Sequence, residues 1–306
     1  MLAIFLKTLP FFALIGLGWL AGRSRFFPAE ATGWLTKFVF YFALSAMLFR
    51  FAAGLDLATL FDPAFVLAYL SGSLAVWGLA FAVARARRQP VADAAMEAHT
   101  AMTGNTGFLG VPMLVVLLGA PAAGPVLMVL TIDMIVFSVL ITALITAARH
   151  GRVTVGALLG GVVRNPMIVS MGAGLAWGAT GVPMPAPLAE FVTLLGAAAT
   201  PGALFAIGAS LAVREASEKL APAAWLSFAK LVLHPLAVGV AALLVFGVAP
   251  YAAGVMIAAA ALPVAGNVYM LAAHYQVALH RVSAAILIST AVSILTVPLV
   301  IAWVTS

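Results

Sequence analysis

The sequence predicts an all-α integral membrane protein with about ten transmembrane helices in two inverted repeats. Three observations lead to this prediction. First, 65% of the 306 residues are hydrophobic and 8% are charged, against roughly half and a quarter in a soluble globular domain. Second, the apolar residues form runs long enough to cross a bilayer. Third, two of these runs carry a Gly-Asn step in their middle, at Gly104-Asn105 and Gly266-Asn267.

Charged residues and clusters of Gly, Pro and Asp divide the chain into apolar runs close to the roughly 20 residues that a spanning helix needs. The first run contains Pro10, lacks a convincing cleavage site and leads directly into another span, so we interpret it as a retained helix. The predicted spans are residues 2–22, 33–53, 63–84, 96–118, 123–148, 160–178, 188–212, 221–247, 250–274 and 283–304.

Each Gly-Asn step predicts a broken helix. The fourth run reads HTAMTGNTGFLGVPMLVVLLG and contains Pro112, and the ninth reads AALPVAGNVYMLAAHY and contains Pro263. Backbone groups freed by a break at membrane depth cannot face lipid, so protein or a water-filled cavity must satisfy them. Paired breaks in two chain halves are typical of a transporter site at the bilayer midplane.

The loop charges predict the orientation. Of the 15 Lys and Arg residues, 11 lie in or beside the loops that follow the first, third, fifth, seventh and ninth runs. The intervening loops carry Asp56, Asp62 and Glu190 but no basic residue. Positive loops remain cytoplasmic, so both termini are predicted to be periplasmic. The 11 residues are Arg23, Arg25, Arg85, Arg87, Arg88, Arg149, Arg152, Arg164, Arg214, Lys219 and Arg281.

Five spans in each half require the second half to be inverted, because an odd number of crossings reverses the chain direction. The predicted halves are residues 1–150 and 151–306. A weak internal repeat supports this division. An offset of 156 residues aligns Pro10 with Pro166, Gly16 with Gly172, Gly18 with Gly174, Gly22 with Gly178, Leu48-Phe49 with Leu204-Phe205, and Ser45 with Pro201.

Four motifs together resemble the auxin efflux carrier family, which includes plant auxin exporters and bacterial carriers of organic acids such as malonate or malate. They are Asn165-Pro166-Met167-Ile168, LGAAATPGALFAIGASLA, LPVAGNVYMLAAHY and LISTAVSILTVPLV. The resemblance covers essentially the whole chain and is densest from 165 to 300. Ser45 stands where the family resemblance predicts a proline in helix 2, so the sequence does not decide whether helix 2 is kinked there.

The resemblance implies a ten-helix fold in which broken helices 4 and 9 cross. Helices 1, 2, 6 and 7 would form a scaffold and a homodimer face, and helices 3–5 and 8–10 a moving, elevator-type transport domain. The chain lacks the long cytoplasmic loop of plant exporters, so it resembles the short bacterial form in the inner membrane.

We predict the substrate site at the two breaks. Their amides, hydroxyls, glycine N–H groups and half-helix N-termini suit a carboxylate, or a cation such as Na⁺ near Asn105. The alternative is that these groups only hydrogen-bond between helices, and the pairing of the breaks favours the site. The predicted residues are Thr103, Gly104, Asn105, Thr106, Gly107, Gly266, Asn267 and Tyr269, with Pro112 and Pro263 beside them.

Three ionisable residues inside predicted spans are candidates for ion coupling. Asp133 lies halfway along the fifth run, and Lys230 and His234 are one turn apart in the eighth. Such groups are costly in lipid and mark function by default, so Lys230 and His234 are candidate partners of Asp133. A static carboxyl that never titrates is the equal alternative for Asp133. Glu97-Ala98-His99 shows no metal-protease spacing and is interpreted as an interfacial helix start.

These observations predict a secondary active transporter of a small organic anion, a mono- or dicarboxylate, coupled to Na⁺ or H⁺. An anion channel or an uncoupled uniporter is the alternative. No Ser/His/Asp or paired-carboxylate set indicates an enzyme, and no GxxxxGK[ST] motif indicates an ATPase. We expect no cofactor besides the coupling ion and no nucleic-acid partner, since the basic residues are explained as topology signals.

Overall fold

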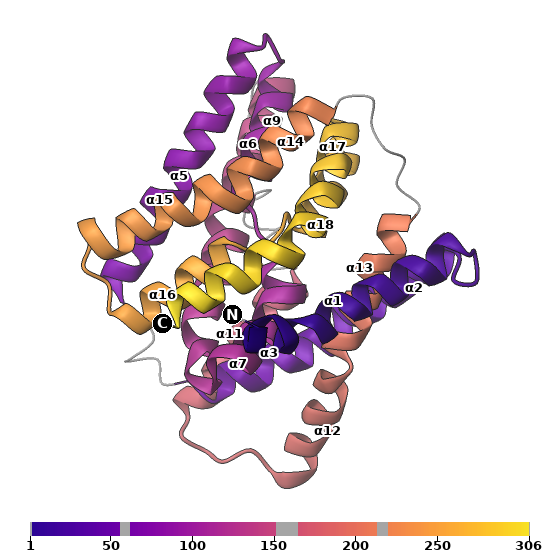
Figure 1. Cartoon of the computed structure of the whole chain (residues 1–306). Coiled ribbons are helices and arrows are strands. Elements are labelled where there is room, and N and C mark those ends of the chain that lie inside the picture. Colours follow the sequence, from indigo (N-terminus) through magenta and orange to yellow (C-terminus); the bar gives the residue numbers. More distant parts are fainter. Residues whose placement is uncertain (1, 56–61, 151–164, 213–219, 306) are drawn as a thin grey trace.

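The computed structural model describes residues 2–55, 62–150, 165–212 and 220–305. Every regular element in these ranges is a helix, and the β-type pairing among them is one isolated bridge between Gly104 and Val264. Figure 1 shows long helices packed around a centre where short helices and extended segments meet. The prediction of an all-helical protein is therefore confirmed.

The first half contains α1 (Leu2–Arg23), α2 (Ala29–Phe38), η1 (Val39–Ala43), α3 (Leu44–Ala53), α5 (Pro63–Ala86), α6 (Val91–Met102), η2 (Thr106–Gly110), α7 (Val111–Leu118), η3 (Ala120–Ala122), α8 (Ala123–Ile132), η4 (Asp133–Phe137) and α9 (Ser138–His150). The second half contains α11 (Pro166–Ala179), α12 (Ala186–Ala197), α13 (Ala199–Ala212), α14 (Leu220–Phe228), η5 (Ala229–Leu233), α15 (His234–Val240), η6 (Ala241–Val245), α16 (Pro250–Ala260), α17 (Gly266–Tyr275) and α18 (Leu279–Val304).

Seven helical stretches are long and apolar enough to cross a membrane. They are Ile4–Arg23, Ala29–Ala53, Pro63–Ala86, Ala120–Ala148, Ala186–Ala212, Leu220–Val245 and Leu279–Val304. Three shorter apolar helices, Thr106–Leu118, Pro166–Ala179 and Pro250–Ala260, lie where the other three spans were predicted. The start of the predicted span 160–178, the loop residue Asp56 and the basic residues Arg152, Arg164, Arg214 and Lys219 lie outside the described residues.

Helix 2 departs from α-helical geometry although it lacks the expected proline. A π-helical turn spans Val39–Ala43, and the Ser45 hydroxyl donates to the Phe40 carbonyl at 3.2 Å. Serine hydroxyls that bond back to an earlier carbonyl are known to bend helices. At the position that the 156-residue offset makes equivalent, α12 ends at Ala197 and α13 begins at Ala199. Ser45 and Pro201 thus each lie just after an irregularity in their own helix, a π-helical turn before Ser45 and an interruption before Pro201.

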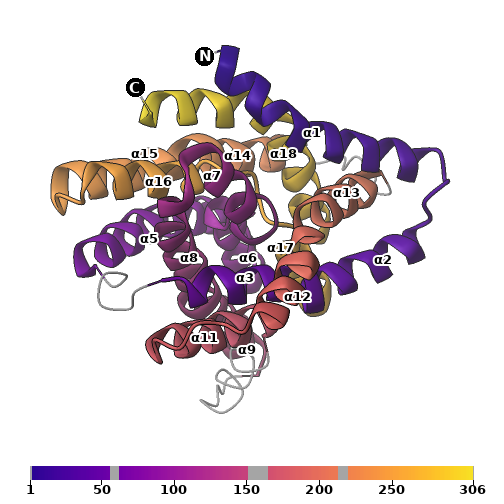
Figure 2. The ribbon, with the colours of Figure 1, turned by 90° about the horizontal axis from the view of Figure 1, so that it is seen from below.

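Two helix pairs pack through glycines in a reciprocal way. A Cβ atom on Gly18 of α1 would overlap the Phe205 carbonyl of α13, and a Cβ on Gly174 of α11 would overlap the Phe49 carbonyl of α3. Both residues of the first pair differ from those of the second by 156 positions. Figures 1 and 2 show α1 beside α13 and α11 beside α3. Small residues permit this close approach of membrane helices.

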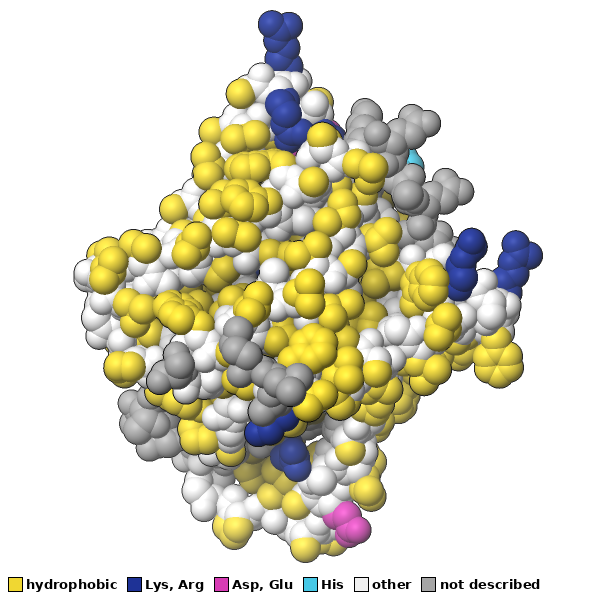
Figure 3. Space-filling view, viewed as in Figure 1, with side chains coloured by type: hydrophobic (Ala, Val, Ile, Leu, Met, Phe, Trp, Pro, Cys, Tyr) yellow, Lys and Arg dark blue, Asp and Glu magenta, His cyan; other side chains and the backbone are white. Residues whose placement is uncertain are grey.

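The surface is largely apolar, and its basic side chains are concentrated in a few places. In Figure 3, Lys and Arg side chains project from the top, from the right-hand edge and from the lower centre, and an apolar surface lies between them. Figure 1 places the α5–α6 connection at the top and the α1–α2 connection at the right. An exposed apolar belt is the expected surface of a multi-pass membrane protein.

The glycine contacts lead to a stability prediction for a pair of matched variants. Gly18→Ala should lower the thermal midpoint of the purified protein, because a backbone carbonyl cannot move aside as a flexible side chain does; overpacking of this kind costs about 1–3 kcal/mol. Gly16→Ala, on the same helix, meets nothing within 4 Å of its Cβ. That control should keep or raise the midpoint, since alanine is the better helix former. Equal midpoints for the two variants would contradict the packing.

Candidate functional site

The two interrupted helices meet at their interruptions. The chain leaves helical geometry between α6 and η2, where Thr103 is extended, and between α16 and α17, where Ala265 is extended. The Asn105 N–H donates to the Pro263 carbonyl at 2.8 Å, and the Ala265 N–H donates to the Thr103 carbonyl at 3.1 Å. Each break therefore supplies a hydrogen-bond acceptor to the other break, which satisfies backbone groups that lipid could not.

Side chains and neighbouring turns satisfy further groups at the crossing. The Ser289 hydroxyl of α18 accepts from the Val264 N–H at 3.1 Å. The Asn105 carbonyl accepts from the N–H groups of Leu109 and Gly110, at 3.1 and 2.9 Å. Pro112 follows directly after η2, so its missing N–H falls where the π-helical turn passes into α7 within the helix Thr106–Leu118. The crossing is thus a fully buried polar structure held by both chain halves.

A cavity of about 620 Å³ lies on one side of the crossing. One wall comes from α2 and α13, and the other comes from the breaks, α17 and the first turn of α18. Asn105 and Phe108 reach the cavity from the first break, and Gly266, Asn267 and Tyr269 reach it from the start of α17. Within the described residues, neither the Asn105 nor the Asn267 side-chain amide makes a hydrogen bond, so both are available to a ligand.

The electrostatics of the cavity favour an anion. Lys37 and His280 line it, whereas no Asp or Glu is among the residues described in its walls. The first N–H groups of α17, beginning at Gly266, have no acceptor within their own helix. The N-terminal end of a helix also carries a partial positive charge. Anion binding at such an end is common in proteins.

The remaining residues of the predicted substrate site do not line this cavity. Thr103, Gly104, Thr106 and Gly107 are buried at the crossing. The Thr103 hydroxyl lies 3.3 Å from Nδ1 of His99, and a Cβ on Gly107 would lie 2.6 Å from the Met167 methyl. The Thr106 hydroxyl is buried without a hydrogen-bond partner in the described part of the chain. All four lie within two residues of Asn105 in the chain.

Behind the crossing, a chain of buried polar side chains connects three helices. The Tyr69 hydroxyl of α5 donates to Asp133 Oδ1 at 2.8 Å, and the Tyr69 ring packs edge-on against the His234 ring at 5.9 Å between centroids. His234 Nε2 lies 2.9 Å from the Ser73 hydroxyl, and its Nδ1 lies 3.2 Å from Lys230 Nζ. All five side chains are buried.

Lys230 connects this chain to the crossing itself. Its ammonium donates to the Ala260 carbonyl, at the end of α16 where the second break begins. A Cβ on Gly104 would lie 3.3 Å from Lys230 Nζ, so Gly104 faces the lysine while the adjacent Asn105 faces the cavity. Lys230 and Asp133 attract each other electrostatically, although no direct ion pair joins them in the described ranges.

Asp133 and Lys230 both lie in π-helical turns. Asp133 begins η4, and Lys230 is the second residue of η5. A π turn inserts one extra residue into an α-helix, which re-aims the side chains around it, and such turns are frequent at functional sites. The Asp133 Oδ2 atom is buried without a hydrogen bond from the described residues. This oxygen has unused capacity for a proton or a cation.

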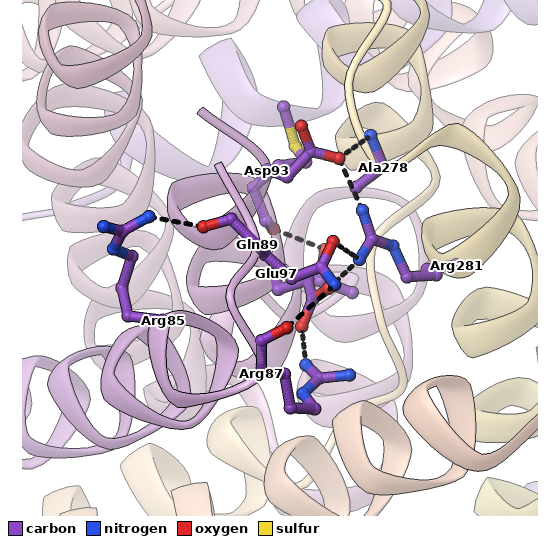
Figure 4. A network of polar contacts seen from close by, with 9 residues as sticks. Arg85, Arg87, Gln89, Asp93, Glu97, Ala278 and Arg281 are labelled. Atoms are coloured by element: carbon purple, nitrogen blue, oxygen red, sulfur yellow. Dashed lines mark hydrogen bonds and ion pairs between the residues drawn. The ribbon is translucent and has the colours of Figure 1, made fainter. Parts of the chain in front are cut away.

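An ionic cluster stands apart from this chain, where α6 and α18 begin (Figure 4). Glu97 is fully buried and pairs with Arg87, and its Oε1 lies 2.6 Å from an Arg281 guanidinium nitrogen. Arg281 also donates to Asp93 at 2.5 Å. The interpretation of Glu97 as part of a simple interfacial helix start is therefore wrong for its carboxylate, because two arginines enclose it. The cluster ties the start of helix 10 to helix 4.

Sequence reasoning missed several residues of the site. Thr32 and Thr36 lie on one face of α2 at the cavity, and their spacing of four residues could have indicated that face. Lys37 is an ionisable residue inside a predicted span, which alone marks a functional candidate. Tyr69 had no local signal, because its partner Asp133 lies on another helix.

Known proteins resemble this chain over almost its whole length. Residues 3–156 and 146–301 match the family described as membrane transport protein. A protein of Rhizobium meliloti (strain 1021), named "Putative malonate transporter", is 34% identical over 295 residues, which are 95% of this chain and 92% of that protein. Both breaks and all the residues of the cavity and of the polar chain lie within the matched ranges.

The hydroxyl of Ser289 provides a test of the crossing. Ser289→Ala should leave the buried Val264 N–H unpaired and destabilise the protein by about 1–3 kcal/mol. Ser293→Ala is the matched control, because that hydroxyl bonds only to the Thr290 carbonyl of its own helix, which also has a helical partner. Thermal midpoints of the two purified variants measure the difference. A control as unstable as Ser289→Ala would show that the Val264 bond contributes nothing specific.

Proposed function

Because this chain belongs to the membrane transport protein family, the auxin efflux carrier family that its motifs resemble, we propose that it is a secondary active transporter of a small organic anion. One observation carries the proposal: the cavity between α2 and α13 on one side and the crossing on the other. Two amides, a lysine and a helix N-terminus converge there, and the described walls contain no carboxylate.

We propose that ten spans form two inverted repeats. The spans are α1, α2–α3, α5, α6–α7, α8–α9, α11, α12–α13, the helix from α14 to η6, α16–α17, and α18. The reciprocal glycine contacts support this arrangement, since Gly22 packs on Ala209 as Gly178 packs on Ala53, with the 156-residue offset again preserved. In this topology both termini face the periplasm and the basic loops face the cytoplasm of a bacterial inner membrane.

The cavity belongs to an inward-facing state in this topology. It is lined by the first turns of α2 and α18 and by the last turns of α13, which adjoin the loops with Arg23, Arg25 and Arg281. The scaffold would contribute α2 and α13, and the transport domain would contribute the crossing, α17 and α18. Sliding of one group past the other exposes the same site to the opposite side, which is alternating access.

The substrate class follows from the cavity chemistry. A carboxylate is matched by the Asn105 and Asn267 amides and by the N-terminus of α17. Malonate is the first substrate to test, because the relative's name specifies it. A channel would need a continuous polar path through the protein, whereas the backbone crossing at Asn105–Pro263 lies across the inner end of this cavity.

We propose that the coupling ion is H⁺ and that the buried polar chain carries it. Asp133 has a free carboxylate oxygen, and Tyr69 holds the other oxygen. The Lys230 ammonium already bonds the Ala260 carbonyl beside the crossing. A second cation at that position would be repelled by the lysine, since like charges interact strongly inside a protein. A proton on Asp133 neutralises the carboxylate and so changes the charge near Lys230, without a second cation having to fit beside the lysine.

The binding role of the two asparagines is testable by replacement. Asn105→Leu and Asn267→Leu should each weaken malonate binding about ten- to a hundredfold, because leucine has a similar volume and cannot hydrogen-bond. Isothermal titration calorimetry on purified protein measures both losses. In the double variant the losses should be non-additive, because both amides contact one ligand. Parent-like binding by both folded variants, or independent losses, would place the site elsewhere.

The coupling role predicts a loss of gradient dependence. In proteoliposomes, Asp133→Asn should still bind malonate, but its uptake should no longer respond to an imposed proton gradient. Glu190→Gln, an exposed acid outside the cavity and the polar chain, is the matched control and should respond as the parent does. Unchanged gradient dependence in Asp133→Asn would assign Asp133 a structural role. Parent uptake driven by a sodium gradient alone would contradict proton coupling.

A further inference from the structure

We infer that Lys37 selects substrates with two carboxylates: its ammonium binds the second carboxylate while the first binds at the crossing. The inference rests on the proposed function and specifies the substrate class of the same site. Both mono- and dicarboxylates fit the proposed substrate class, and Lys37 would distinguish between them. The position, the lack of a partner and the surroundings of this lysine carry the argument.

Lys37 lies in the last turn of α2, is exposed, and is one of the residues that line the cavity. It is eight residues after Ala29, the first residue of α2, which places it about 12 Å along the helix axis. In the described part of the chain its ammonium makes no hydrogen bond and no ion pair, and its one charge-related contact is the Trp34 ring at 4.4 Å. A charged side chain that lines a cavity without a protein partner is available to a ligand of opposite charge.

The contrast with Lys230 sharpens this point. The Lys230 ammonium is buried and uses both His234 and the Ala260 carbonyl as partners. Lys37 instead lines the wall of the cavity and is exposed there. Lys230 therefore has its counter-groups within the protein, while Lys37 has the space of the cavity in front of it. A lysine is a point charge on a flexible stem, which suits a mobile anionic substrate.

An aromatic contact fixes the level of Lys37 relative to the crossing. The Phe40 ring of η1, which continues α2, stacks on the Phe108 ring, with centroids 6.2 Å apart and planes at 20°. Phe108 follows Asn105 by three residues, and Phe40 follows Lys37 by three residues. The stack thus holds α2 against the first break about one helical turn away from Lys37. An anion held by Asn105 and Asn267 therefore has Lys37 on the facing wall.

The cavity offers separate binding positions for two carboxylates of one substrate. One carboxylate occupies the Asn105 and Asn267 amides and the N-terminus of α17, none of which carries a formal positive charge. The other carboxylate forms a charge-assisted hydrogen bond with Lys37, a stronger contact than a neutral amide provides. A substrate with one carboxylate leaves Lys37 unpaired and gains nothing from it. Discrimination between the two classes therefore depends on this side chain.

Binding of malonate and its monoamide, malonamate, tests the inference. The two probes have nearly the same size, and malonamate carries one carboxylate instead of two. Calorimetry on the purified full-length parent should show tighter binding of malonate. In Lys37→Gln, malonate should bind about ten- to a hundredfold more weakly, and malonamate should bind within about twofold of the parent. Lys37→Arg should retain the preference for malonate.

Controls separate this role from a structural one. Lys7→Gln removes an exposed lysine of α1 that does not line the cavity, and it should bind both probes as the parent does. Lys37→Met provides a second neutral variant with a straight side chain if Lys37→Gln fails to fold. Trp34→Leu removes the stacked ring and should keep the discrimination, because the ammonium remains.

Three outcomes would overturn the inference: equal binding of both probes by the parent, parallel losses for both probes in the Lys37 variants, or parent-like discrimination without the lysine. Parallel losses would indicate that Lys37 only supports the cavity wall. Failure of the parent to bind any mono- or dicarboxylate would refute the proposed function first, and this inference with it. Parent binding with unchanged discrimination in Lys37→Gln would refute the inference alone.

Discussion

The crossing of two broken helices is the constraint on which the rest of the structure depends. A helix break at membrane depth frees N–H and C=O groups that lipid cannot satisfy, and each such group costs several kcal/mol unless it is paired. Here the breaks pair with each other, through Asn105 with Pro263 and Ala265 with Thr103. Helices 4 and 9 must therefore lie together, and Ser289 of α18 is required beside them.

The crossing also joins the two functional regions. Gly104 and Asn105 are adjacent, yet one faces Lys230 and the other faces the cavity. The carbonyl of Ala260, at the end of α16, bonds Lys230, and α17 presents its N-terminus to the cavity a few residues later. In the proposed cycle, a ligand in the cavity and a proton on the polar chain would both act on the paired breaks. In such an arrangement each changes the affinity for the other by the same factor.

The sequence predicts the breaks well and the site only in part. Long apolar runs define the helices, and Gly-Asn with a nearby proline marks an interruption, because these are local signals. Outside a helix, no 3.6-residue period predicts the direction in which a side chain points. The sequence pattern therefore could not show that Asn105 lines the cavity while Thr103 and Thr106 do not. The Tyr69–Asp133 bond joins residues 64 positions apart, and Glu97 is buried only because Arg281 folds over it. Both depend on tertiary contacts.

The proposed repeat accounts for features that recur in both halves, and the charged groups are those that do not recur. Glycine contacts and breaks recur in both halves, since the same close packing and the same backbone pairing are needed twice. The charged groups do not recur: the offset that relates Gly18 to Gly174 places Thr193 opposite Lys37. Asp133 and Lys230 likewise each stand in one half only. A symmetric framework can open equally to both sides. In the proposed cycle, the charged groups that occur in only one half therefore determine the substrate and the coupling ion.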